Sequence, residues 1–520
     1  MIATDPQLPE NVSRRQFLKG AGALAGGAVV AGSAFEAVSL LSGTGRASLG
    51  PVLPSYSVRA SGPVRAFHSR PDLRPPTLTL TSAADSSDGY LFLGPWGGQG
   101  DVHDDPGPLM VDHQAEPVWF HPVTSNQQAT HQWGTNFRSW MYRDTPVLGW
   151  WEGFVAHGGF GQGQGTLIDS SYQQVASVKA VGGHQMDLHE FTVTPQGTAL
   201  FTCFPEVVQA DLSSVGGPQR GQLRNPVFQE VDIRTGKLLL EWHGVDHIPL
   251  TDSYLPVSEP FDYLHINSIN VAPDGHLLVS GRHTWALYKL DRRTGEVIWR
   301  LGGKSSDFQM AKNAQFAWQH DAQQPANGTI TLFDNGSEGS INTETRSRGL
   351  ALAVDESGRT VKVAQEFIHS KPLLAVAMGS VQTLPSGNMM VGWGTEPYLS
   401  DFTSEGKLLA DGELLSGYKS YRSFRLPWKG LPQHAPAITV GRDPLTLKTI
   451  LYASWNGATD VAASWHVHAG PSASSLKPIG VARRRGFETA IPLGRATGYF
   501  SVTALDEDGS RLGVSPVASL

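Results

Sequence analysis

The sequence contains a single cysteine among 520 residues, and this scarcity excludes several kinds of protein. Cys203 alone can form neither an internal disulfide nor a cysteine-rich zinc cluster. Charged residues are also few, at 17% of the chain, and the formal net charge of -7 provides no basic surface for nucleic acid or an anionic membrane. We therefore expect a fold without disulfides and no nucleic-acid partner.

Long hydrophobic runs are also missing beyond the N-terminus. The one apolar segment ends near Ala34 and follows Arg14 and Arg15, which is typical of the twin-arginine (Tat) export signal that carries folded proteins. An ordinary membrane anchor is the alternative, but the segment is short and Gly-rich for a stable span. Residues 1–47 are thus predicted to be signal and linker, with cleavage after Ala34 or Ala47 left open. We expect export by the Tat machinery to the periplasm, cell surface or medium, with no stable membrane span after signal removal.

Glycine and proline, by contrast, are abundant, with 58 and 34 residues. They separate short apolar runs, most clearly Ile269–Val271, Leu277–Ser280, Ala286–Leu290 and Val297–Arg300. Four short strands joined by turns make one antiparallel unit, and the same pattern recurs at intervals of roughly 40 to 60 residues. Six such units over residues 48–430 predict an all-β fold, a six-bladed β-propeller, with five or seven blades as alternatives.

The last part of the chain, residues 431–520, reads as a separate series of short strands. Trp455 and Trp465 are expected in the core of a β-sandwich, and Tyr499 stands where a tyrosine corner is expected. This segment resembles a fibronectin type III module.

Histidines occupy equivalent places in successive units. His189, His265 and His320 stand just before the first strand of three units, and Arg282 follows the second strand of the His265 unit. The innermost strand of a propeller blade begins at the central channel, so these side chains are expected to converge. Imidazoles can attack or exchange protons near neutral pH and a guanidinium holds oxyanions, which together suit chemistry on a tetrahedral oxyanion.

Two other interpretations stay open at this point. The histidines could be structural hydrogen-bonding groups, or three of them could bind zinc and leave an open position. The nearby Arg282 disfavours zinc, and no metal is predicted. Asp101–Asp105 is interpreted as a solvated loop rather than a cation site.

Three segments carry these residues in a specific pattern: Asp262–Ser268, Ser280–Thr284, and Trp318–Ala322 leading to Leu332–Gly336. They resemble the arylsulfotransferase family, bacterial enzymes that move a sulfuryl group between phenols without an adenylyl sulfate cofactor. Weaker matches extend the resemblance over about residues 60–425: Phe67–Pro71, Trp150–Gly153 and Val391–Gly394. The chain lacks the extra N-terminal β-domain and the cysteine pair of the best-studied branch, and is closer to the short, divergent branch.

The resemblance implies roles for individual residues. His320 looks like the nucleophile that becomes a transient sulfohistidine, while Arg282 and His265 would hold the sulfuryl oxygens, with Asn267 close by. His189 resembles the remaining active-site histidine.

Two further residues, His283 and Trp318, are predicted to contact substrate. Trp285 and Trp393 are further candidates for stacking a phenol, although tryptophans in propellers more often pack between blades.

The resemblance therefore predicts an exported sulfotransferase that uses an aryl sulfate donor, a phenolic acceptor and no cofactor. Aryl sulfate hydrolysis is one alternative. The other is a non-catalytic propeller that binds an anion or a protein.

Overall fold

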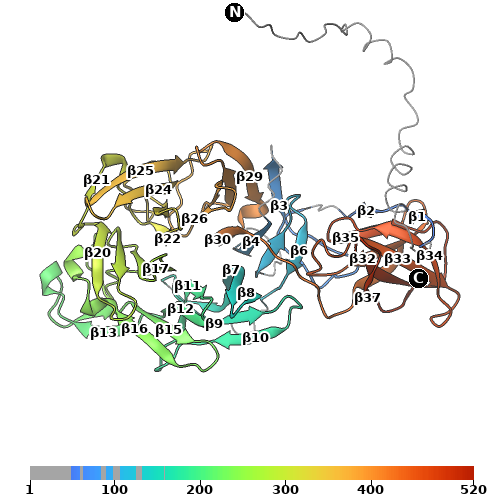
Figure 1. Ribbon diagram of the computed structural model, residues 1–520, viewed down its shortest axis with the longest axis horizontal. Coiled ribbons are helices and arrows are strands. Elements are labelled where there is room, and N and C mark those ends of the chain that lie inside the picture. Colours follow the sequence, from blue (N-terminus) through green and yellow to red (C-terminus); the bar gives the residue numbers. More distant parts are fainter. Residues whose placement is uncertain (1–48, 59–61, 83–88, 98–105, 124–131, 157) are drawn as a thin grey trace, which may run out of the picture.

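The structure, a computed structural model, describes residues 49–58, 62–82, 89–97, 106–123, 132–156 and 158–520. Its regular structure there is β-strand, apart from five 3₁₀ helices: Ser213–Val215, Gly244–Asp246, Leu250–Asp252, Lys312–Ala314 and Leu415–Gly417. The all-β prediction is confirmed (Figure 1). The export signal and Asp101–Asp105 lie outside the described residues, and in the part that is described no helix is long and apolar enough to cross a membrane.

Antiparallel groups of strands follow one another along the chain. The early groups are β4 (Tyr90–Trp96), β5 (Leu109–Val111) and β6 (Pro117–Phe120); β7 (Gln132–Tyr142), β8 (Thr145–Val155), β9 (Gly161–Ile168) and β10 (Gln174–Val178); and β11 (Met186–Val193), β12 (Thr198–Cys203), β15 (Val227–Asp232) and β16 (Leu238–His243). Within the last of these, β13 (Val207–Ala210) and β14 (Gly221–Arg224) form a separate hairpin. The second and third groups are joined into one sheet by the pairing of Met186 in β11 with Gly163 in β9.

The later groups repeat the same order. They are β17 (Ile266–Val271), β18 (Leu277–Gly281), β19 (Ala286–Leu290) and β20 (Val297–Gly302); β22 (His320–Gln323), β23 (Thr329–Asp334), β24 (Arg348–Asp355) and β25 (Thr360–Phe367), extended by β21 (Gln309–Met310); and β26 (Ser380–Thr383), β27 (Met389–Gly392), β28 (Tyr398–Phe402) and β29 (Leu408–Leu414). The four strands predicted at 269–271, 277–280, 286–290 and 297–300 are thus present as β17 to β20.

The groups are arranged around a common centre (Figure 1). Their first strands contact one another in the order β7, β11, β17, β22, β26 and β30 (Lys419–Leu426), and β30 contacts β7 in turn. Side chains at the inner ends of these strands therefore meet near the axis although they are far apart in sequence.

Strands from the two ends of the ring close it. β30 pairs with β4 and so completes the first group, while β3 (Leu78–Ser82) pairs with β29 and extends the last group. Local sequence patterns give no sign of these pairings, because each joins segments more than 320 residues apart.

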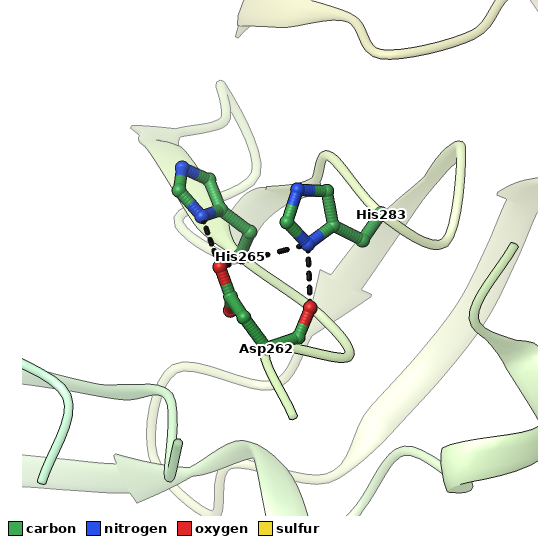
Figure 2. Close-up of side chains that lie close together, drawn as sticks. All are labelled: Asp262, His265 and His283. Atoms are coloured by element: carbon green, nitrogen blue, oxygen red, sulfur yellow. Dashed lines mark hydrogen bonds and ion pairs between the residues drawn. The ribbon is translucent and has the colours of Figure 1, made fainter. Parts of the chain in front are cut away.

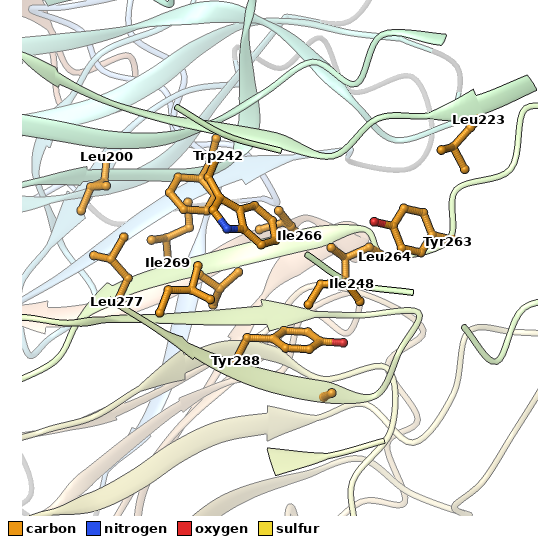
Figure 3. Close-up of a cluster of buried hydrophobic side chains, with 14 of the residues drawn as sticks. Leu200, Leu223, Trp242, Ile248, Tyr263, Leu264, Ile266, Ile269, Leu277 and Tyr288 are labelled. Atoms are coloured by element: carbon orange, nitrogen blue, oxygen red, sulfur yellow. The ribbon is translucent and has the colours of Figure 1, made fainter. Parts of the chain in front are cut away.

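Apolar side chains fill the space between neighbouring sheets. Figure 3 shows Leu200 and Trp242 beside Ile269 and Leu277, and all four side chains are at most 1% exposed. Burial of this kind stabilises by roughly 25 cal/mol per Å² of apolar surface. It makes each sheet a firm support for the side chains at its inner end.

The C-terminal strands form two facing sheets. One has the order β1-β34-β33-β36-β37, with β38 on β36, and the other has the order β2-β35-β32-β31. Their bounds are β1 (Val52–Leu53), β2 (Tyr56–Ser57), β31 (Ala437–Arg442), β32 (Thr449–Ser454), β33 (Ser464–Gly470), β34 (Lys477–Arg483), β35 (Glu488–Pro492), β36 (Tyr499–Leu505), β37 (Arg511–Val514) and β38 (Ala518–Ser519).

Three expectations for this part can be compared with the structure. Trp455 and Trp465 are buried in its core, as predicted. Tyr499 is the first residue of β36, as predicted, and its side chain is 38% exposed. The expectation that the ring begins at residue 48 is also corrected, because β1 pairs with β34 and β2 with β35. Extended backbone at a free sheet edge pairs readily, whatever its place in the sequence.

The buried Glu488 carboxylate joins the C-terminal sheets to the segment that enters the ring. It accepts hydrogen bonds from the backbone N–H groups of His68 (3.0 Å) and Ser69 (2.6 Å) and from the Ser69 hydroxyl (2.5 Å). The predicted family segment Phe67–Pro71 therefore contributes to this junction.

We expect Glu488→Gln to lower the free energy of unfolding by about 2 kcal/mol, because hydrogen bonds to a charged acceptor are lost and the amide adds an unwanted donor. Urea unfolding measures the change. Glu413→Gln, at a half-exposed glutamate that lies 3.8 Å from Lys371, is the control and is expected to change stability by less than about 0.5 kcal/mol. Equal stability of Glu488→Gln and the wild type would contradict the role of this junction.

Candidate functional site

The four residues predicted to converge lie on three consecutive groups of strands. His265 directly precedes β17, Arg282 directly follows β18, and His320 is the first residue of β22. His189 lies inside β11 rather than before it, which corrects the expected position.

Irregular backbone accompanies each of these histidines. The strand register shifts between Met186 and Phe191, between Ile266 and Ser268, and between His320 and Gln323. His265, Trp318 and Asp321 have φ values of 52°, 59° and 52°. Bulges re-aim side chains, and left-handed backbone at non-glycine residues is strained and concentrates at functional sites.

Two histidines face each other at the centre. His265 Nε2 lies 3.1 Å from His189 Nε2. The other nitrogen of each ring contacts an aspartate at 2.6 Å: His189 Nδ1 contacts Asp187 Oδ2, and His265 Nδ1 contacts Asp262 Oδ2. Both imidazoles are nearly fully buried.

This row of four side chains must hold an extra proton. Two carboxylates and two neutral imidazoles carry two protons, whereas three hydrogen bonds in series need three. Burial, and next the adjacent His189, lower the pKa of His265 well below its usual value. Although burial raises the pKa of Asp187, the charge of His189 brings it below the usual value. The row as a whole therefore holds one proton more than two carboxylates and two neutral imidazoles would carry.

Asp262 orients two imidazoles at once. Figure 2 shows His265 directed at its carboxylate and His283 at its backbone carbonyl, with His283 Nδ1 2.5 Å from that oxygen. The ligand atoms of Asp262, His265 and His283 lie within 4.8 Å of one another, a spacing a metal ion could use. Each Nδ1 is, however, hydrogen-bonded to Asp262, and the Arg282 cation contacts His283. The donor set therefore suits hydrogen bonding better than metal binding.

Arg282 reaches across the centre of the ring. Its Nη1 donates to His283 Nε2 at 2.8 Å, and its Nη2 donates to the Val376 carbonyl at 2.9 Å. Its buried Nε–H has no hydrogen-bond partner among the described residues. Arg282 thus offers a fixed positive charge and one unused donor beside the histidines.

His320 is oriented by a buried amide. Asn335 Nδ2 donates to the carbonyls of Ala375 (3.0 Å) and Met378 (3.1 Å), which turns Asn335 Oδ1 toward His320 Nδ1 at 2.7 Å. Since Oδ1 only accepts, the His320 proton is on Nδ1 and Nε2 keeps its lone pair. An imidazole in this tautomer is a nitrogen nucleophile.

Burial lowers the pKa values of His320 and His283. Burial, followed by the Arg282 cation, holds the pKa of His320 well below its usual 6.5. Burial lowers the pKa of His283 to about 3. His320 and His283 are therefore neutral near pH 7.

We expect a step in which neutral His320 acts as the nucleophile to keep its rate constant, within about twofold, from pH 7.5 to pH 6. Protonation of His320 would inactivate it, so activity should be lost only as pH falls through a folded-state pKa below 6.5. An ordinary histidine would lose about three quarters of its neutral form over the same interval. Single-turnover release of phenol from an aryl sulfate measures this, and a fourfold fall by pH 6 would contradict the assignment.

The remaining predicted residues surround this centre. Asn267 Nδ2 donates to the Gln319 carbonyl at 2.7 Å, so it holds the backbone that precedes His320. Trp318 is fully buried, with its ring centroid 5.3 Å from the Arg282 guanidinium carbon. Trp285 stacks on Tyr254 at 3.6 Å.

Trp393 packs elsewhere. It is fully buried and donates to Ser400, so this tryptophan is a packing residue.

Sequence reasoning missed several residues of the site. Asp262 and Asn335 fall inside the family-like segments, and Asp187 stands two residues before His189, so their positions were the available signal. Tyr421, whose ring contacts both His189 and His320, comes from β30 and had no local signal.

The family model described as arylsulfotransferase (ASST) matches residues 138–413, more than half of the chain, and a model of the twin-arginine translocation signal matches residues 11–31. A comparison with curated proteins gave no match.

Solved structures give only distant similarities. One is a protein of unknown function from Bacteroides caccae (13% identity, 65% of this chain and 98% of the other, TM-score 0.39). Another is a catalytically inactive virginiamycin B lyase from Staphylococcus aureus (9% identity, 80% and 99%, TM-score 0.34). A third is regucalcin from Agrobacterium tumefaciens (12% identity, 62% and 81%, TM-score 0.30). At these TM-scores the similarities support no inference.

The all-β ring holds imidazoles and a guanidinium at its centre, and these side chains suit a group-transfer enzyme that acts on oxyanions. The chain belongs to the arylsulfotransferase family and is a sulfotransferase enzyme. Its twin-arginine signal directs it to the Tat machinery for export to the periplasm or cell surface.

Proposed function

We propose that the enzyme transfers the sulfuryl group of an aryl sulfate to a phenolic acceptor through a sulfohistidine at His320. The observation that carries this proposal is the Asn335–His320 hydrogen bond of 2.7 Å, which leaves Nε2 with a lone pair. Arg282, His265 and His189 are proposed to surround the sulfuryl group, with Asn267, His283 and Trp318 as supporting contacts.

In the first half-reaction, the His320 Nε2 lone pair attacks sulfur, an N–S bond forms and the bond from sulfur to the aryl oxygen breaks. The departing phenolate takes the extra proton of the His189–His265 pair. The Nε–H of Arg282, which is buried without a partner among the described residues, would donate to a sulfuryl oxygen, and one such donor is typically worth about 3 kcal/mol of barrier lowering.

In the second half-reaction, the phenolic acceptor returns a proton to the His189–His265 pair. Its oxygen attacks sulfur, the N–S bond breaks and His320 is restored. The histidine pair therefore serves as acid in one direction and base in the other.

We also propose the architecture that holds this site. The cyclic contacts of the first strands support a six-bladed propeller over residues 62–430. The orders β31-β32-β35 and β34-β33-β36-β37 support a fibronectin type III-like sandwich over residues 431–520, to which residues 49–58 add β1 and β2.

The test uses 4-nitrophenyl sulfate as donor and a phenol as acceptor. The expected result is release of 4-nitrophenol together with a sulfated acceptor. When the acceptor is left out, a peptide that carries the sulfuryl group on His320 is expected. Release without a sulfated acceptor would favour aryl sulfate hydrolysis. No release from a range of aryl sulfates would favour a propeller that only binds anions or proteins.

A further inference from the structure

Arg422 lies outside the predicted site but contacts three of the strands that carry the site residues. Arg422 is part of β30, and its side chain is 1% exposed. Its Nη2 donates to the carbonyls of His189 (3.2 Å) and Asn267 (2.9 Å). The guanidinium therefore touches the backbone of β11 and of β17 at the level of the central histidines.

The same guanidinium pairs with the acidic residue that follows each of two histidines. Nη1 and Nη2 donate to the Glu190 carboxylate at 3.2 and 3.1 Å, and Nε lies 3.2 Å from Asp321 Oδ1. Glu190 follows His189, and Asp321 follows His320. A shift of Arg422 would therefore move both histidine-bearing segments.

The surroundings keep this group charged and fixed. Burial disfavours the charge, but Glu190 and Asp321 raise the pKa of Arg422 above its usual value. Glu190 also accepts from the Ile269 N–H of β17 at 3.1 Å. A register shift between Ser420 and Ser423 lets β30 present Arg422 to the centre.

Asp321 needs this support because its backbone is in the left-handed region, at φ 52°. Such a conformation persists only where neighbouring contacts over-determine it. Arg422 supplies one of those contacts, one residue away from His320.

We propose that Arg422 is a positioning residue that holds the strands of His189, Asn267 and His320 in the register needed for sulfuryl transfer, an inference that rests on the proposed function. It does not touch the substrate. Its contribution is to keep Nε2 of His320 and the His189–His265 pair at their mutual distance.

The experiment compares Arg422→Lys with Arg425→Lys in the full exported chain. Lysine keeps the charge of Arg422 but cannot make its planar set of contacts. Arg425 is a matched control, since it lies on the same strand, is equally buried and pairs with Asp401 at 2.6 Å. Each variant is mixed with 4-nitrophenyl sulfate without acceptor, and both the amplitude and the rate constant of the phenol burst are recorded.

We expect Arg422→Lys to keep a burst of about one phenol per folded chain while its rate constant falls about 100-fold, as for a misplacement on the order of 1 Å. Arg425→Lys is expected to keep the wild-type rate constant. A merely structural role would reduce the amplitude and leave the rate constant unchanged, and that result would overturn the proposal. Equal slowing in both variants, or no slowing in Arg422→Lys, would also overturn it.

Failure of the proposed function gives a different result. A wild-type chain that releases no phenol from any aryl sulfate overturns the function and this inference together. An active wild type with an unaffected Arg422→Lys variant overturns only the role of Arg422.

Discussion

His320→Ala is expected to lower sulfuryl transfer by about 10⁵-fold or more, because it removes the proposed nucleophile, and loss of such a group leaves only the rate that binding and charge stabilisation support. The burst of phenol and the labelled His320 peptide should both disappear. Steady-state release of 4-nitrophenol and mass analysis of the trapped enzyme measure these effects.

A matched control separates lost chemistry from lost folding. His369 is also buried, lies between β25 and β26 in the chain, and contacts Asp411 at 3.1 Å, outside the proposed site. His369→Ala should reduce stability but keep the burst rate constant of the folded fraction. Transfer by His320→Ala at the wild-type rate would reject His320 as the nucleophile.

Arg282→Lys is expected to lower the rate constant of the first half-reaction by about 10³-fold, toward the upper end of the effect of losing one oxyanion donor. Arg282 joins His283 and the Val376 carbonyl through its two terminal nitrogens and keeps Nε for a further acceptor. An ammonium on a flexible stem cannot make these three directed bonds together.

The measurement is again the burst with 4-nitrophenyl sulfate, at several donor concentrations. Arg292→Lys is the control, since Arg292 pairs with Glu230 away from the histidines. Wild-type rates in Arg282→Lys would mean that Arg282 only links the loops that precede β19 and β26.

Much of the fold could be predicted because turn residues mark each strand. The Pro273-Asp274-Gly275 turn between β17 and β18 and the Asp291–Gly295 turn before β20 fix local antiparallel pairs, and their positions agree with the sequence pattern. Pairings such as β30 with β4 depend on ring closure, which no local pattern specifies.

The site, like the fold, could be predicted where local patterns specify it and not where long-range pairing does. The repeat pattern predicted that His189 and His265 approach each other, because both belong to the inner strands of neighbouring units, although His189 lies within β11 rather than before it. The tautomer of His320 depends on the amide orientation of Asn335, and the contacts of Arg422 depend on the strand that closes the ring. These are properties of side-chain direction and long-range pairing, so the spacing of residues along the chain could not give them.

Four strands near the start of the described chain take partners from beyond residue 400: β1, β2, β3 and β4. While the chain is being synthesised, β1, β2 and β3 lack their strand partners, and β4, which pairs early with β5, keeps one edge open until β30 has left the ribosome. A chain cut short before β30 would expose open sheet edges and would lack Arg422 as well as Tyr421. Closure of the ring and assembly of the proposed site thus both wait for β30, which matches an export route that carries folded proteins.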